Sequence, residues 1–262
     1  MGFFGRLFEK KECSICGGDI GLLGNRKLED GNCCKECAKK LSYWFDDRRH
    51  STVAQINQQL QYREENKAKV AAFNVTRSFG EDYTLQLDED KQQLMVVRTG
   101  RIAEENPDVV DFSQVTGCDL DVDERRYEVM RTDREGNEVS YNPPRYRYEY
   151  DFFIIIRVNH PWFDDMKFKL NRSSVDVAQA VPRGFGMRGG MGNAAMQNYE
   201  CQQYQDMGRE IKEAILNARQ TARDTAVAAA APKTAVTCPW CGATTLPDAN
   251  GCCEYCGGAV NA

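Results

Sequence analysis

Hydrophobic positions recur at helical spacing near the N-terminal third of the chain. Between residues 51 and 73 the apolar residues lie three or four positions apart, as on one face of a helix. Thr52 precedes them and Gln55 follows three residues later, a pair typical of a capping box. The pattern predicts a connecting helix over 51–73. Its apolar positions are Val53, Ile56, Leu60, Val70 and Ala71.

The hydrophobic period changes to two between about residues 75 and 172. The clearest run extends from Arg145 to Val158, where even positions are aromatic or aliphatic and the first odd positions are charged. This alternation is typical of antiparallel strands that cover a core on one side. Gly136–Asn137 and Asn142–Pro144 predict loops. Shorter alternating runs occupy 83–87, 118–122 and 166–170.

A second helical period follows a glycine-rich segment. Residues 183–192 predict a loop, and 194–227 predict one long amphipathic helix. Its apolar stripe consists of Met196, Tyr199, Met207, Ile211, Ala214, Ile215 and Ala218.

Together these elements predict an α+β fold, an antiparallel sheet domain with a long C-terminal helix against its open end. The order of strands followed by one helix resembles a PH-like domain over roughly 75–225. Small cysteine-rich modules flank this domain. The expected divisions are a leader 1–12, a module 13–50, the helix 51–73, the PH-like domain 74–227, a linker 228–236 and a module 237–262.

Composition narrows the functional classes. The 262 residues carry a formal net charge of −5, which disfavours a general nucleic-acid binder because such proteins present basic surfaces. The longest apolar stretch, 152–156, is far shorter than the roughly 18 residues of a membrane-spanning helix. The N-terminus lacks the pattern of a secretory signal peptide. We therefore expect a cytoplasmic protein.

Ten of the twelve cysteines lie in two short clusters, and eight of these form C-x-x-C pairs. In a chain without a secretory signal, this placement favours metal binding over disulfides. Two C-x-x-C turns supply the four soft ligands of a tetrahedral zinc ion. The predicted ligands of two zinc ions per chain are Cys13, Cys16, Cys34, Cys37, Cys238, Cys241, Cys253 and Cys256.

Two alternatives stay open at these clusters. Cys33 and Cys252 each precede a predicted ligand, so either could coordinate in place of its neighbour. Iron competes with zinc because Cys238–Gly242 resembles a rubredoxin turn, although the spacer of eleven residues between the turns is short for that family. Four cysteines leave no open coordination position, which indicates structural rather than catalytic metal.

The N-terminal module also resembles a known family. The stretch CSICGGDIGLLGNRKLEDGNCCKECAKKLS, followed by RRHSTVAQINQQLQYREENKAKVAAFN, is similar to bacterial DUF4428 proteins over about 13–75. The resemblance implies a zinc-ribbon-like domain and a bacterial origin, and it implies no reaction. The C-terminal CPWCG and CEYCGG turns resemble a generic zinc ribbon.

Two further groups are candidates for contact with partners. The leader carries apolar residues on one side of a possible short helix, which suits a membrane interface or a partner protein unless they pack on the protein itself. Cations of the first module suit phosphate, although they also offset the charge of four thiolates. The leader residues are Phe3, Phe4, Leu7 and Phe8, and the cations are Arg26, Lys27, Lys39 and Lys40.

No arrangement of residues typical of catalysis is visible in the sequence, and we expect no enzymatic activity. The interpretation we favour is a zinc-binding scaffold or adaptor that docks protein partners, with the membrane periphery as one open location. The alternative is a nucleic-acid-binding regulator that uses the basic first module. The oligomeric state is not predicted.

Overall fold

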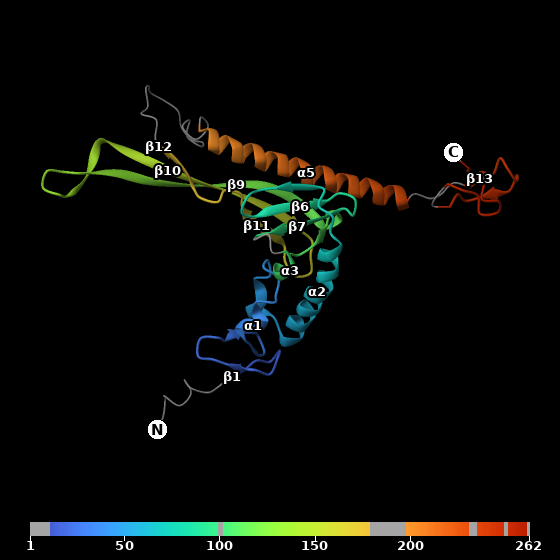
Figure 1. The fold of residues 1–262 in the computed structure, drawn as a ribbon, viewed down its shortest axis with the longest axis horizontal. Helices are drawn as coiled ribbons and strands as arrows, with labels where there is room; N and C mark the ends of the chain where they lie inside the picture. The colour runs from blue at the N-terminus through green and yellow to red at the C-terminus, as the bar shows by residue number, and fades with distance from the viewer. Residues whose placement is uncertain (1–10, 99–101, 179–197, 231–234, 249–250, 261–262) are drawn as a thin grey trace. The chain divides into compact units, whose positions relative to one another are not determined.

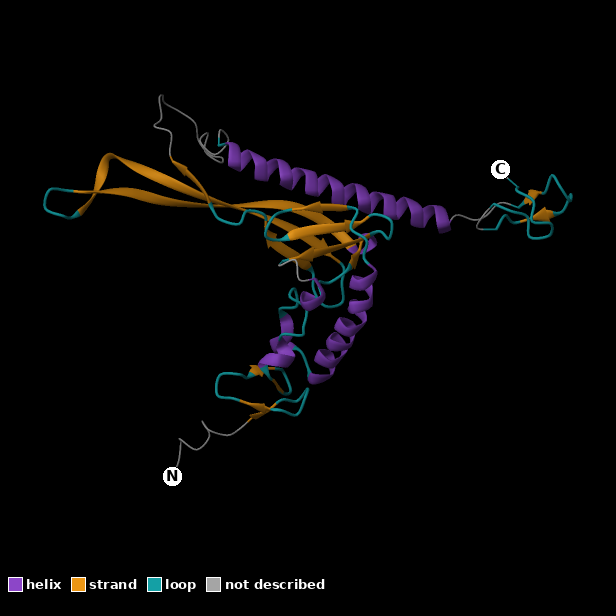
Figure 2. Ribbon diagram, in the orientation of Figure 1, coloured by secondary structure: helices purple, strands orange, loops and turns teal. Residues whose placement is uncertain are grey.

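Antiparallel sheets and one long C-terminal helix build the chain in this computed structural model, which confirms the predicted α+β class (Figures 1 and 2). The chain divides into two compact parts, residues 1–219 and 220–262. The structure describes residues 11–98, 102–178, 198–230, 235–248 and 251–260. Within these ranges no helix is both long and apolar enough to cross a membrane.

The first cysteine module consists of two short hairpins and two short helices that pack on the next helix. Leu28 and Cys33 are fully buried in its core, which also includes Ile56 of the following helix. The elements are β1 (Lys11–Glu12), β2 (Asp19–Ile20), β3 (Arg26–Lys27), β4 (Asn32–Cys33), α1 (Lys35–Ala38) and the 3-10 helix η2 (Asp47–His50).

Helix α2 (Val53–Ala72) begins with the predicted capping box. The Gln55 N–H donates to Thr52 Oγ1 at 3.3 Å, and the Thr52 N–H donates to Gln55 Oε1 at 2.8 Å. The Asp30 carboxylate accepts from the Val53 N–H at 2.7 Å and links the module to the helix start. These contacts satisfy N–H groups that a helix terminus otherwise leaves unpaired.

The predicted apolar stripe of α2 is confirmed except at Ala71: Val53 and Leu60 pack with Ile56 on the module core, and Val70 packs on a second buried cluster. Besides Ile56, the helix buries Gln59, Arg63 and Asn66, whereas Ala71 is exposed. These buried polar residues were not predicted, and they are buried because the segment that packs against them is itself polar. Asn66 accepts from the Val109 N–H at 3.0 Å and donates to the carbonyl of Pro107 at 2.8 Å.

Asp108 is the centre of this polar contact. It is 1% exposed and accepts from the Ser42 hydroxyl at 2.7 Å, the Tyr62 hydroxyl at 3.0 Å and Arg63 Nη1 at 2.7 Å. Ser42 belongs to the cysteine module, Tyr62 and Arg63 to α2, and Asp108 to the segment before strand β8. One buried carboxylate therefore joins three parts of the fold.

Two four-stranded antiparallel sheets follow. In the first, the strand order is β5-β6-β7-β8. Gly80 directly follows β5 and has φ +95°; a Cβ there would lie 2.2 Å from the Tyr83 carbonyl oxygen. The strands are β5 (Arg77–Phe79), β6 (Thr84–Asp88), β7 (Gln93–Val97) and β8 (Val110–Asp111), with α3 (Ile102–Glu105) and the 3-10 helix η3 (Phe112–Gln114) between or after them.

In the second sheet the longest strand, β10, has β9 on one side and β11 and β12 on the other. Ile154 of β10 lies opposite Leu120 of β9 and Phe168 of β11, so the predicted alternation places these apolar residues on one face. The strands are β9 (Val115–Thr132), β10 (Glu138–Val158), β11 (Asp165–Lys169) and β12 (Val175–Ala178).

Strand β10 begins earlier than predicted. Asn142–Pro144 lie inside the strand, at a register shift between Ser140 and Arg145, and do not form the expected loop. Prolines are tolerated there because a bulge needs no ladder hydrogen bond from them. The chain reverses instead at Gly136, as predicted, where the Asn137 carbonyl accepts from the Asp133 N–H at 2.9 Å.

Helix α5 (Tyr199–Ala230) packs on the apolar face of the second sheet. Tyr204 stacks on Phe152 with ring centroids 5.6 Å apart, and Gly208 admits Leu120, whose Cδ1 would lie 2.7 Å from an added Cβ. Ile211 and Ile215 are fully buried, as the predicted stripe requires. The stripe was wrong at Tyr199, which is 73% exposed, and Met196 lies outside the described residues.

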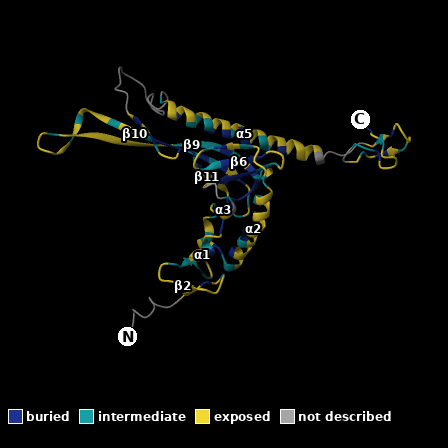
Figure 3. Cartoon of the chain, in the orientation of Figure 1, coloured by how far each residue is buried: buried dark blue, intermediate teal, exposed yellow. Residues whose placement is uncertain are grey.

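The ends of β9 and β10 extend past the other strands as a two-stranded ribbon (Figures 1 and 3). From Asp123 to Thr132 every residue of β9 is exposed. Arginine side chains lie over tyrosine rings along the ribbon, with Arg126 4.6 Å from the Tyr146 centroid and Arg147 5.6 Å from the Tyr127 centroid. These contacts order the ribbon without a covering layer.

We expect Asp108→Asn to lower the free energy of unfolding by about 3–5 kcal/mol, because it leaves the buried Arg63 guanidinium without its counter-charge. Urea denaturation measures the change. Glu36→Gln is the matched control: it removes the same charge from an exposed pair with Lys39, so the loss should be far smaller than that of Asp108→Asn. Equal effects of the two substitutions would contradict the role of Asp108.

His160 predicts a pH dependence of stability. Its ring stacks on Phe163 and meets the Tyr62 ring edge-on, and burial lowers the pKa of His160 below 6.5. The unfolded chain therefore binds a proton first as the pH falls. The free energy of unfolding should decrease as the pH falls below about 6.5. Above that pH, titration of His160 should not change the free energy of unfolding.

Urea denaturation across this range, at fixed zinc concentration, tests the prediction against His160→Phe. The variant keeps an aromatic ring but cannot bind a proton, so its free energy of unfolding should decrease less at low pH than that of the wild type. An unchanged pH profile in the variant would show that His160 does not contribute.

Candidate metal centres

The structure brings Cys13, Cys16, Cys34 and Cys37 together, with all four Sγ atoms within 4.8 Å of one another. Cys13 and Cys16 lie in the turn between β1 and β2, while Cys34 caps α1 and Cys37 lies within it. Gly17 completes the first turn with φ +71°, a conformation that glycine adopts without strain.

The second group, Cys238, Cys241, Cys253 and Cys256, gathers in the same way within the C-terminal part. Cys238 follows β13 (Val236–Thr237), and Cys241 precedes β14 (Thr244–Thr245), which pairs with β13. The Gly242 N–H donates to the Cys238 carbonyl and the Gly257 N–H to the Cys253 carbonyl, so both turns close alike.

Sulfur spacing in both groups fits a tetrahedral zinc ion. Four sulfurs each about 2.3 Å from zinc lie about 3.8 Å apart. The Sγ atoms of Cys16 and Cys34 are 3.8 Å apart, and those of Cys241 and Cys253 are 3.7 Å apart. All four positions of each group are cysteines, so a bound zinc ion would have no protein-free position for a reacting water.

Backbone N–H groups stabilise negative charge on sulfurs of both groups. Burial raises the pKa of Cys13, but N–H donors of Cys16, Cys34 and Ile15 outweigh it and lower the value to about 6. Burial also raises the pKa of Cys253, but the N–H donors of Cys256 and Tyr255 outweigh this effect and lower the pKa to about 6. Thiolates formed at neutral pH are the form that binds metal.

The two extra cysteines lie outside both groups. Cys33 is fully buried, its Sγ donates to the Cys34 carbonyl at 3.4 Å, and burial raises the pKa of Cys33 to about 11. Cys252 is half-buried and takes part in a β-bridge with Ala259. The geometry therefore favours Cys34 and Cys253 as ligands over these neighbours.

The four candidate phosphate contacts differ in their surroundings. Lys39 pairs with Glu36 at 2.9 Å, and Arg26 donates to the carbonyls of Leu23 and Asn25. Lys27 and Lys40 are exposed. The leader residues Phe3, Phe4, Leu7 and Phe8 and the glycine-rich segment 183–192 lie outside the described residues.

Both modules expose large apolar side chains that the sequence analysis missed. Leu22 and Leu23 are 82% and 93% exposed in the first module, and Trp240 and Tyr255 are 75% and 72% exposed in the second. Trp240 and Tyr255 each occupy the third position of a C-x-x-C turn. The sequence did contain a signal for this exposure: an aromatic side chain between two predicted ligands has no room inside so small a module.

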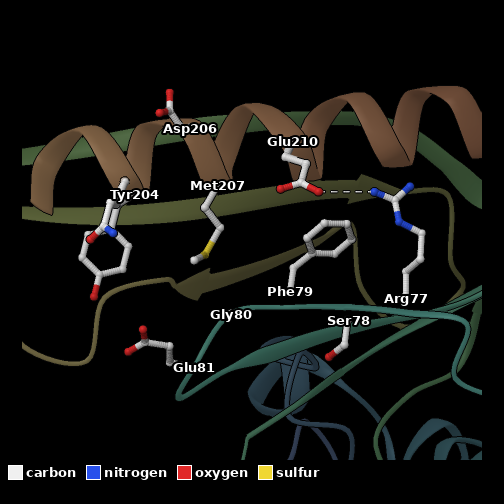
Figure 4. A pocket seen from close by; sticks show the side chains of 10 residues that line it. Arg77, Ser78, Phe79, Gly80, Glu81, Tyr204, Asp206, Met207 and Glu210 are labelled. Carbon is white, nitrogen blue, oxygen red and sulfur yellow. Dashed lines mark ion pairs between the residues drawn. The ribbon is translucent and has the colours of Figure 1, made fainter. Parts of the chain in front are cut away.

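A groove of about 610 Å³ lies between β5 and α5 (Figure 4). Phe79, Tyr204 and Met207 point into it, and Arg77 pairs with Glu210 at 3.5 Å at one end. Arg77 also lies 4.9 Å from the Phe79 ring centroid. The lining offers apolar surface and an ion pair but no nucleophile held by a neighbouring base.

Metal analysis tests the ligand assignment. We expect two zinc equivalents per chain, and one equivalent after Cys37→Ser or Cys256→Ser, because three thiolates hold zinc far less tightly than four. Cys33→Ser and Cys252→Ser are matched controls that should keep two. Loss of one equivalent from either control would show that the neighbouring cysteine is the ligand.

Comparison with known proteins identifies one segment. No curated protein and no solved structure matches the chain, so the PH-like resemblance and the bacterial origin stay predictions. Residues 11–59 match the family described as Domain of unknown function (DUF4428), a segment that contains the whole first cysteine group and the start of α2. This match shows that residues 11–59 are similar to the DUF4428 family.

Proposed function

We propose that the protein is a non-enzymatic, zinc-stabilised scaffold that docks protein partners through its two cysteine modules. The carrying observation is the exposure of Leu22, Leu23, Trp240 and Tyr255 on modules too small to hide them. Tryptophan and tyrosine supply much of the binding energy of protein interfaces, because they bury a large area with few rotatable bonds.

The chemistry of the metal centres supports a structural role for zinc. A catalytic zinc keeps one position for water or substrate, whereas each of these groups fills four positions with cysteine. The second module has a core of only Cys238, Cys253 and Val260, with Val236 packed against it. Metal binding would therefore supply most of its folding free energy and hold its apolar side chains in place.

The groove between β5 and α5 supports the same proposal. Strand β5 is at the edge of its sheet, and the groove beside it has an apolar floor of Phe79 and Met207. Extended segments of other proteins bind at sheet edges by adding a strand. The groove would thus offer a second docking position on the central domain.

Nucleic-acid binding through the first module is the weaker alternative. Lys39 and Arg26 already contact groups of their own module, and the second module contains no lysine or arginine from Cys238 to its end. Docking at a membrane periphery through the leader is a further prediction. Neither has a described contact in its favour.

Quantitative affinity purification after chemical cross-linking tests the proposal. We expect specific partners whose recovery falls more than about tenfold with Trp240→Ser/Tyr255→Ser, because truncating aromatic anchors commonly costs 2 kcal/mol or more, as an order of magnitude. Glu254→Ser is the matched control, as it alters an exposed polar residue of the same turn.

Zinc content must be equal in both variants, so that loss of binding is not loss of folding. Identical protein recovery from the wild type and the double variant would contradict docking through the second module. Recovery dominated by nucleic acid, abolished by salt and by neutralising Lys27 and Lys40, would favour the alternative instead.

A further inference from the structure

The outer edge of β9 is an unpaired strand edge of unusual length. Within the described residues, β10 is the strand that pairs with β9, and nothing pairs with its other side. From Asp123 to Thr132 the strand is exposed throughout. Such an edge presents a row of backbone donors and acceptors, which proteins usually block.

The opposite edge of the same ribbon is blocked. There β10 carries Pro143 and Pro144, which lack an N–H, at a register shift that bends the strand. No proline occurs between Val115 and Thr132 in β9. The ribbon therefore has one edge protected against strand addition and one edge left open.

The charge pattern of the open edge indicates its occupant. Residues 122–132 contain three acidic residues and three arginines, so this stretch has no net charge and would not select a strongly charged partner. Within the described residues no carboxylate forms an ion pair with Arg126 or Arg131; their guanidinium groups lie over tyrosine rings instead. Their charges are exposed and available to an opposing strand.

Strand geometry restricts how two copies of β9 can pair. Directly opposed residues of antiparallel strands point to the same face of the sheet. A two-fold axis perpendicular to the sheet also leaves each residue and its symmetry copy on the same face. A symmetric pair must therefore be centred on a residue. Centred on Tyr127, it places Arg126 opposite Glu128 and Asp123 opposite Arg131, each twice by symmetry, with no like charges opposed from 122 to 132.

Pairs centred on either neighbouring residue bring like charges opposite each other. A pair centred on Arg126 opposes Glu124 to Glu128, and one centred on Glu128 opposes Arg125 to Arg131. Directly opposed like charges destabilise a sheet, and opposite charges stabilise it. We propose that a second copy of this chain pairs with β9 antiparallel about Tyr127, so that the ribbons of two copies form one continuous sheet.

Sedimentation of the full-length protein over a range of concentrations tests the pairing. The wild type should form a dimer. Arg126→Glu or Glu128→Arg alone should raise the dimer Kd about tenfold or more, because both symmetric contacts become repulsive. The double variant R126E/E128R exchanges the charges and should restore the dimer. Arg134→Glu, in the turn beyond the paired stretch, is the matched control.

Cross-linking identifies the register. A photoreactive benzoylphenylalanine at Tyr127, in a mixture of ¹⁴N- and ¹⁵N-labelled chains, should join two different copies within residues 122–132. A monomer at every concentration overturns the proposal. The proposal is also overturned if R126E does not weaken the dimer or if the double variant does not restore it. An inter-chain cross-link outside this stretch would overturn it as well.

Discussion

A buried carboxylate fixes how the N-terminal part of this protein is built. Removing Asp108 from water is costly unless nearby groups replace the lost solvation. Here the hydroxyl of Ser42, the hydroxyl of Tyr62 and the guanidinium of Arg63 do so together. Because these groups come from the first cysteine module and helix α2, the charge is satisfied only when both lie correctly against the segment before β8. Edge-to-face packing of Phe45 on Trp162 adds an apolar contact between the module and the connection from β10 to β11.

The two cysteine groups share a local geometry but differ in what surrounds them. The first has a core that continues into α2 through Leu28, Leu41 and Ile56. The second has little apolar material beyond Val236 and Val260. Burial of apolar area can stabilise the first module to some extent without metal, whereas the second would depend on bonds from its cysteines to a metal ion. Zinc availability would thus affect the C-terminal module more strongly, along with the exposed Trp240 and Tyr255 that it carries.

The described surface carries two features on which the proposed docking role rests. Exposed apolar side chains would provide contact area to a partner, and open strand edges would provide backbone hydrogen bonds. Two of the edge strands are β5, which borders the groove, and β9, which runs along the ribbon. An edge as long as that of β9 would be an aggregation hazard unless one specific neighbour covered it.

Features encoded by spacing along the chain were predictable from the sequence. The C-x-x-C turns, the capping box of Thr52 and Gln55, and the alternation of β10 depend on residues a few positions apart, and the structure retains each of them. Only the tertiary structure showed that α2 also buries polar side chains, because Arg63 pairs there with Asp108, 45 residues away. The groove of β5 and α5 and the open edge of β9 likewise depend on which strands become neighbours. Periodicity gives the face that a side chain occupies, but it does not give the partner that the face meets.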